Sequence, residues 1–129
     1  MNSNQKTKII MVHSYKGGTG KTAIAINLAQ LLAMKKGVKV LLIEQDTGGS
    51  TFSNVFKTTP PAVWNDFYLS NTPLKDLIIH HKHFDIICAK GKEIAIPEGE
   101  STRIFYSRHL ERFRWESKWL RKNYEYIIL

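Results

Sequence analysis

A short glycine- and lysine-rich segment between two regular stretches of sequence constrains the fold more than any other feature. The segment is KGGTGKT, at residues 16–22. The apolar run 8–13 precedes it and is typical of a buried parallel strand. Residues 21–34 carry apolar side chains at helical spacing, and a second apolar run follows at 38–44. A strand, a helix and a second strand in this order favour a right-handed parallel crossover, and therefore an α/β fold.

The same segment has the composition of a phosphate-binding loop. Gly17, Gly18 and Gly20 permit backbone conformations that are closed to other residues, and they leave room for a phosphate to approach. The backbone N–H groups of such a loop form an anion-binding nest, and the N-terminus of the following helix adds positive potential. Lys21 is placed to reach the β- and γ-phosphates of a nucleotide, and the Thr22 hydroxyl is placed to ligate Mg²⁺.

The details of the loop match a variant pattern. The first glycine of the ordinary pattern GxxxxGK[ST] is replaced by Tyr15. The variant KGGxGK[ST] is met instead, and in it Lys16 adds a second lysine. This segment resembles the deviant Walker A motif of the ParA/MinD family of P-loop ATPases, which act in chromosome and plasmid partitioning. Three other segments are similar to parts of that family: LLIEQD at 41–46, FDII at 84–87 and YEYII at 124–128.

The resemblance implies ATP and Mg²⁺ as cofactors, and it implies a role for each residue of the site. Lys21 would hold the phosphates and Thr22 would ligate the metal. Lys16 would act as a catalytic residue across a nucleotide-bound dimer, on the phosphates of the partner. Asp46 aligns with the second aspartate of the family's D-x-D segment, which helps to position the attacking water and the magnesium shell. The remaining nucleotide contacts would come from Gly17, Gly18, Thr19 and Gly20.

The D-x-D segment departs from the family pattern. Glu44 replaces its first aspartate, and Thr47, Gly48 and Ser50 replace the usual Pro, Gln and Asn. Without the resemblance, a solvated loop carboxylate would be the more common role for Asp46. These departures weaken the expectation for this switch segment and leave the expectation of phosphate binding unchanged.

The extent of the fold is a separate expectation. The sequence has 129 residues and stops at Leu129, inside the apolar segment 124–129 and before the switch II aspartate of the family. That segment is either an edge strand that simply ends or an inner strand of a longer fold, and the second is favoured because chain termini normally lie outside the core. We expect one P-loop nucleotide-binding domain over 1–129, an N-terminal portion of a parallel sheet flanked by helices. Residues 1–7 are expected to be a disordered tail. Hydrolysis by this chain alone is expected to be absent or very slow.

Charge and composition limit the partners without choosing among them. A net charge of +8 favours anionic partners such as nucleotides, nucleic acid or membrane surfaces. The apolar runs are too short to cross a bilayer, and the single cysteine, Cys88, forms no intrachain disulfide, so we expect a cytoplasmic protein. The leading hypothesis is an ATP-binding, Mg²⁺-dependent ATPase module that forms a nucleotide-dependent homodimer to position DNA or another cargo. The alternatives are a non-catalytic nucleotide- or DNA-binding truncated paralogue that acts with a full-length partner, and an inactive remnant.

The rest of the chain predicts further elements of an α/β fold. The pattern predicts short helices at 53–57, 64–69 and 74–80, strands at 84–89, 94–96 and 124–129, and a helix over 101–123. Tyr106, Leu110, Phe113 and Leu120 form the predicted apolar stripe of that last helix. Its basic residues interleave with Phe105, Trp115 and Trp119, which is compatible with nucleic-acid or membrane contact but more typical of a solvated face. The three histidines at 80, 81 and 83 beside Asp85 suggest a metal cluster less than a solvated helix end.

Overall fold

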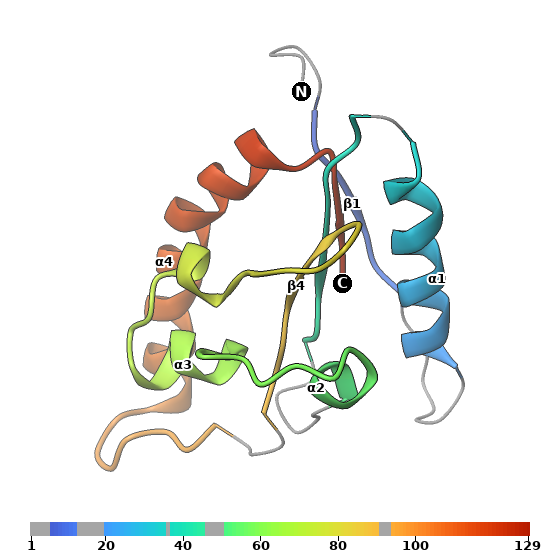
Figure 1. Ribbon diagram of the computed structural model, residues 1–129. Coiled ribbons are helices and arrows are strands. Elements are labelled where there is room, and N and C mark those ends of the chain that lie inside the picture. Colours follow the sequence, from blue (N-terminus) through green and yellow to red (C-terminus); the bar gives the residue numbers. More distant parts are fainter. Residues whose placement is uncertain (1–5, 13–19, 36, 46–50, 91–93) are drawn as a thin grey trace.

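The computed structural model describes residues 6–12, 20–35, 37–45, 51–90 and 94–129 (Figure 1). Along these ranges the elements are β1 (Lys8–Ile10), α1 (Lys21–Ala33), β2 (Val40–Ile43), α2 (Thr51–Val55), α3 (Trp64–Leu69), the 3₁₀ turn η1 (Leu74–Leu77), β3 (Ile79–His80), β4 (Asp85–Ile87), α4 (Thr102–Asn123) and β5 (Tyr126–Ile128). None of the helices within these ranges is long and apolar enough to cross a bilayer.

The sheet has the strand order β1-β5-β2-β4-β3. β1, β5, β2 and β4 are parallel to one another, and β3 joins β4 antiparallel. β5 therefore lies inside the sheet, with Leu129 N–H donating to the Ile10 carbonyl at 2.9 Å and Val12 N–H donating to the Leu129 carbonyl at 2.9 Å. The α/β prediction is confirmed, and the alternative of an edge strand at 124–129 is wrong.

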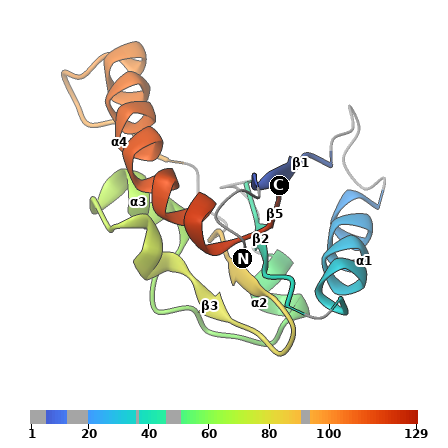
Figure 2. The same ribbon diagram turned by 90° about the horizontal axis from the view of Figure 1, so that it is seen from above.

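Helices cover both faces of this sheet, with α1 on one side and α4 on the other (Figures 1 and 2). Side chains alternate across β2, as the period of a strand requires. Val40 and Leu42 join the core under α1, whereas Leu41 and Ile43 join the core under α4. A four-residue strand buried on both faces explains why its sequence is a continuous apolar run.

α1 packs on the sheet through small side chains. Ala25 and Ala29 are buried against the strands, whereas the larger Ile24 and Leu31 are exposed. After the helix, Gly37 adopts a left-handed φ of 78°, the conformation that glycine favours just past a helix end. The helix and its end are confirmed.

α4 is present where it was predicted, and the C-terminal half of its predicted stripe is buried, since Leu120 is buried and Phe113 packs against the core, whereas its N-terminal half buries a different face. Its buried residues are Phe105, His109, Ser117 and Leu120. Tyr106 and Leu110 of the predicted stripe are exposed. The N-terminal half of α4 contacts α3 rather than the strands, since the rings of Phe105 and His109 lie 6.4 and 5.2 Å from the ring of Tyr68. That contact turns another face inward.

Two shorter predictions were wrong. The segment 74–80 is not one helix, because η1 ends at Leu77 and β3 then pairs Ile79 with Ile86 and His80 with Asp85. The β-branched pair Ile78–Ile79 suits an extended strand better than a helix. Within the described range 94–129, residues 94–96 are in neither a strand nor a helix. Residues 1–5 of the expected tail lie outside the described residues, but Thr7 is held in place, with its Oγ1 2.7 Å from the Tyr124 carbonyl oxygen.

Candidate nucleotide-binding site

The carboxyl ends of the parallel strands meet at one edge of the sheet, and the N-terminus of α1 lies at this same edge (Figure 1). α2 also lies there, because its Phe52 is bonded to Glu44 at the end of β2. Open parallel sheets bind ligands in this place, where loops connect strand ends to helix starts. Gly20, the last glycine of the predicted phosphate-binding loop, directly precedes α1 and therefore lies at this edge.

α1 begins on a glycine in a conformation that other residues avoid. Gly20 has φ 85° and ψ 13°, and its carbonyl accepts the Ile24 N–H at 3.0 Å. A Cβ on Gly20 would meet no described atom within 4 Å, so the backbone angle rather than crowding calls for glycine. Among the described residues no side chain caps this helix start, although the first N–H groups of a helix have no acceptor within it. These donors and the helix dipole suit a phosphate.

Lys21 and Thr22 occupy the first turn of α1, where both are partly exposed. Both therefore lie at the edge of the sheet where the parallel strands end, beside N–H groups that no described side chain caps. The Lys21 ammonium and the amide N–H groups can donate to the oxygen atoms of a nucleotide phosphate. The Thr22 hydroxyl oxygen is a ligand of the kind that Mg²⁺ prefers. Lys16, Gly17, Gly18, Thr19 and Asp46 lie outside the described residues, so their roles stay predictions.

Glu44 connects three segments through its carboxylate, a structural role that the sequence analysis did not predict. Its side chain is buried at the end of β2, where Oε2 accepts the Phe52 N–H at 3.0 Å and Oε1 accepts the Ala89 N–H at 2.7 Å. One carboxylate therefore connects β2, the start of α2 and the end of β4. A signal was available, because an acidic residue directly after a buried strand needs partners for its charge.

The end of β4 is fixed by further bonds. The Trp64 N–H donates to the Cys88 carbonyl at 2.7 Å, and the Asn65 Oδ1 accepts the Lys90 N–H at 3.0 Å. Burial and the nearby charge of Glu44 raise the pKa of the Cys88 thiol to about 11. The thiol therefore stays protonated, and Cys88 packs as a small buried side chain in the core under α1.

The histidine-rich segment lies at the opposite edge of the sheet, near the start of β4. No group of three or more histidine, cysteine or acidic side chains in the described ranges could hold a metal. The exposed His80 instead places Nδ1 2.8 Å from Asp85 Oδ1, and the Tyr124 hydroxyl donates to Asp85 Oδ2 at 2.5 Å. Burial, more than this bond, raises the pKa of Tyr124 far above its usual range.

Comparison with known proteins places this geometry in a family. A family model described as an AAA domain matches residues 7–129. An uncharacterized ATP-binding protein of Methanocaldococcus jannaschii is 38% identical over 68% of this chain and 34% of its own length. The sporulation initiation inhibitor protein Soj of Bacillus subtilis is 30% identical over 95% of this chain and 48% of its own. The tyrosine-protein kinase CpsD of Streptococcus pneumoniae is 39% identical over 54% of this chain and 30% of its own.

Solved structures share the fold. A plasmid partition protein of Borrelia burgdorferi bound to AMPPNP superposes with a TM-score of 0.69 at 25% identity, over 95% of this chain and 51% of that one. The septum site-determining protein MinD of Pyrococcus horikoshii, complexed with Mg-ADP, superposes with a TM-score of 0.67 at 25% identity, over 95% of this chain and 47% of that one. This chain spans from about a third to about half of the length of these relatives. With the family model matched from residue 7 to the last residue, this chain belongs to the ParA/MinD-type family of P-loop ATPases.

Proposed function

We propose that this chain binds ATP with Mg²⁺ at the start of α1 and serves as the nucleotide switch of a protein that positions DNA or another cargo. One observation carries the proposal: α1 begins, without a side-chain cap, on a left-handed glycine at the carboxyl edge of a parallel sheet. Lys21 and Thr22 follow at once in its first turn. The phosphates would accept the free N–H groups, Lys21 would neutralise their charge, and Thr22 would hold the metal.

The segment that carries Asp46 would sense the nucleotide. Its two ends are held together by one side chain, because Glu44 accepts the backbone N–H of Phe52. Because this bond already brings the two ends together, the entropy of closing the segment is not lost again when a ligand binds. This supports a role for Asp46 in positioning the attacking water and the magnesium shell.

Lys16 would connect nucleotide binding to assembly. We expect it to reach the phosphates of a second copy in a nucleotide-bound dimer, and the dimer to be the state that engages cargo. Support comes from the names of similar proteins, which include a plasmid partition protein and MinD. The kinase CpsD among the relatives offers a different use of the same phosphate loop, in which phosphate passes to tyrosine rather than to water.

Calorimetry with ATP and Mg²⁺ tests the site. Lys21→Ala removes a charge-assisted contact worth about 1.5–3 kcal/mol, so the affinity for ATP should fall roughly 10- to 150-fold. Lys35→Ala is the matched control, because Lys35 is an exposed lysine past the other end of the same helix. Equal affinities for the wild type and Lys21→Ala would refute the site.

The reaction product distinguishes transfer of phosphate to water, as in an ATPase switch, from transfer to tyrosine, as in a kinase. Any label that purified protein slowly releases from γ-labelled ATP with Mg²⁺ should appear as inorganic phosphate, at a rate far below about 1 s⁻¹, and Thr22→Val should abolish this Mg²⁺-dependent release. Label recovered on protein tyrosine instead would favour the kinase and contradict the proposed switch.

A further inference from the structure

We infer that the outer face of α4 is a docking surface for an anionic lipid bilayer. This face carries the ion-paired Arg108 and Glu111 and, on the same side of the helix, five residues that we call the outer stripe: Ile104, Trp115, Lys118, Trp119 and Lys122. The inference goes beyond nucleotide binding and does not depend on it.

Large apolar side chains of the outer stripe are left in solvent. Ile104 is 62% exposed, Trp115 is 70% exposed and Trp119 is 42% exposed. Tryptophan has an apolar ring and a polar N–H, and this combination is favoured where a bilayer meets water. Two tryptophans four residues apart lie on the same side of a helix, so both can enter one lipid surface together.

The charge of the outer stripe is positive and unpaired. Within the described residues, neither Lys118 nor Lys122 has an ion-pair partner, and Lys118 Nζ lies 4.0 Å from the centre of the Trp115 ring. Arg108 and Arg114 differ, because they pair with Glu100 at 2.8 Å and Glu111 at 3.6 Å. Lysines beside exposed tryptophans complement the negative headgroups of a lipid surface.

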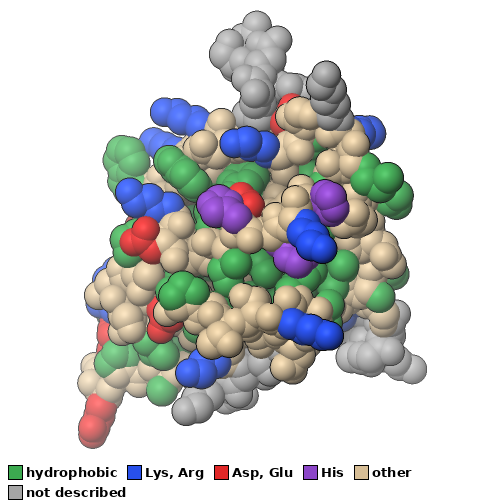
Figure 3. All heavy atoms as spheres, viewed as in Figure 1, with side chains coloured by type: hydrophobic (Ala, Val, Ile, Leu, Met, Phe, Trp, Pro, Cys, Tyr) green, Lys and Arg blue, Asp and Glu red, His purple; other side chains and the backbone are tan. Residues whose placement is uncertain are grey.

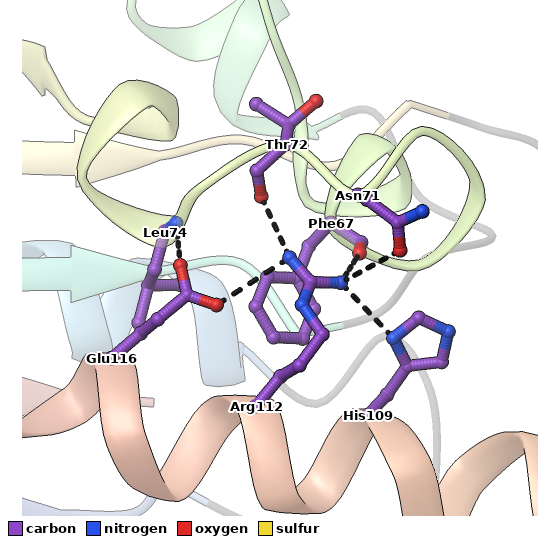
Figure 4. A network of polar contacts seen from close by, with 7 residues as sticks. All are labelled: Phe67, Asn71, Thr72, Leu74, His109, Arg112 and Glu116. Carbon is purple, nitrogen blue, oxygen red and sulfur yellow. Dashed lines mark hydrogen bonds and ion pairs between the residues drawn. The ribbon is translucent and has the colours of Figure 1, made fainter.

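The opposite side of α4 is fixed to the protein by a polar network (Figure 4). Arg112 donates to the carbonyls of Phe67 and Thr72, and Glu116 accepts the Leu74 N–H at 2.7 Å. The Arg112 guanidinium also lies 4.1 Å from the centre of the Phe67 ring. The outer stripe is therefore held in one orientation before it meets a partner, which lowers the entropy lost on binding.

The shape of this surface favours a membrane over a single-stranded nucleic acid. α4 is a rod of 22 residues, about 33 Å long, along one outer side of the molecule (Figure 2). A single strand of nucleic acid binds in a basic groove and is often contacted by arginine forks, whereas a straight helix presents a convex surface. The arginines without an ion-pair partner in the described residues, Arg103 and Arg121, lie on the other flank of α4 with Leu110. A flat bilayer can contact the whole stripe at once.

Vesicle co-sedimentation of the 129-residue chain tests the inference. The vesicles are phosphatidylcholine alone, or phosphatidylcholine with phosphatidylglycerol as about one third of the lipid. Two double variants are compared. The stripe pair is Lys118→Gln with Lys122→Gln in the outer stripe, and the flank pair is Arg103→Gln with Arg121→Gln on the other flank. Each pair removes the same charge, and each cation at a lipid surface contributes about fivefold, so the stripe pair should weaken binding ~25-fold and the flank pair far less.

The apolar contribution has its own matched variants. Trp115→Gln with Trp119→Gln should abolish sedimentation with the mixed vesicles, while Leu110→Gln should leave it unchanged. Because all of these positions are exposed, we expect the variants to keep the fold. Far-UV circular dichroism identical to that of the wild type will verify this. The wild-type tryptophan emission should shift to shorter wavelength when the mixed vesicles are added.

Three results would overturn the inference. The first is no preference of the wild type for the mixed vesicles over phosphatidylcholine. The second is equal loss of binding in the stripe pair and the flank pair. The third is tighter, stripe-dependent binding to a single-stranded oligonucleotide than to the vesicles, which would assign the outer stripe to nucleic acid.

Discussion

At the scale of single residues, Glu44 connects the candidate site to the stability of the fold. Replacing Glu44 with alanine leaves the buried N–H groups of Phe52 and Ala89 without their acceptor. Each unsatisfied buried group costs about 1–3 kcal/mol, so Glu44→Ala should lower the free energy of unfolding by about 2–6 kcal/mol. Urea denaturation measures this change. Gln45→Ala is the control, because Gln45 is exposed and should change stability little. A Glu44→Ala protein as stable as the wild type would show that the two bonds contribute nothing.

His109 is the residue through which we expect acid to destabilise the protein. Its side chain is buried, Nε2 has no partner among the described atoms, and Nδ1 accepts from Arg112 at 3.1 Å. Burial and then the charges of Arg112 and Arg108 lower the pKa of His109. The unfolded chain, with an ordinary pKa of about 6.5, therefore takes up the proton first as the pH falls. Stability from this histidine is present above pH ~6.5 and is lost below it.

The measurement is the urea midpoint at a series of pH values from about 8 to 5. His109→Phe keeps an aromatic ring among Phe67, Tyr68 and Phe105 and has no group to titrate. Its midpoint should change less between neutral and acidic pH than that of the wild type. Identical pH dependence in the two proteins would assign the acid sensitivity to other groups.

At the scale of elements, the two ends of α1 offer a matched comparison. Gly20 at its start and Gly37 after its end both have left-handed φ angles, 85° and 78°, and neither would crowd a Cβ against any described atom. Alanine at either position should therefore cost about 1–2 kcal/mol through the backbone alone. Only Gly20 adjoins Lys21 and Thr22, so Gly20→Ala should also lower the affinity for ATP, whereas Gly37→Ala should not. Calorimetry and urea denaturation on both variants check this, and equal effects on affinity would contradict it.

Most elements could be predicted because their signals are local. The strand–loop–helix–strand unit at the start of the chain combines apolar runs, glycines and lysines in one short stretch. The buried face of the N-terminal half of α4 could not be predicted, because contacts with α3, distant in sequence, turn Phe105 and His109 inward. β3 was missed because its two residues take a strand conformation only when paired with β4.

At the scale of the whole molecule, the sheet explains how much of the site the sequence could predict. Parallel strands bring their carboxyl ends together, so one loop motif after β1 is enough to place the candidate site at that edge. Gly20, Lys21 and Thr22 lie there as predicted. The task of Glu44 depends on bonds to two segments beyond it in the chain, which a local pattern does not contain.

The last prediction concerns assembly, and it depends on two lysines of one loop. Lys16 lies five positions before Lys21, and two ammonium groups about 4 Å apart repel by about 4 kcal/mol near a protein surface. This repulsion disfavours Lys16 beside Lys21 unless a triphosphate lies between them. The resemblance to the family implies that Lys16 instead reaches the triphosphate bound by the partner subunit. Sedimentation with a non-hydrolysable ATP analogue and Mg²⁺ should therefore show a dimer for the wild type and for Lys35→Ala. Lys16→Ala should stay monomeric while calorimetry still detects nucleotide binding. A nucleotide-driven dimer of Lys16→Ala would mean that Lys16 acts within its own subunit.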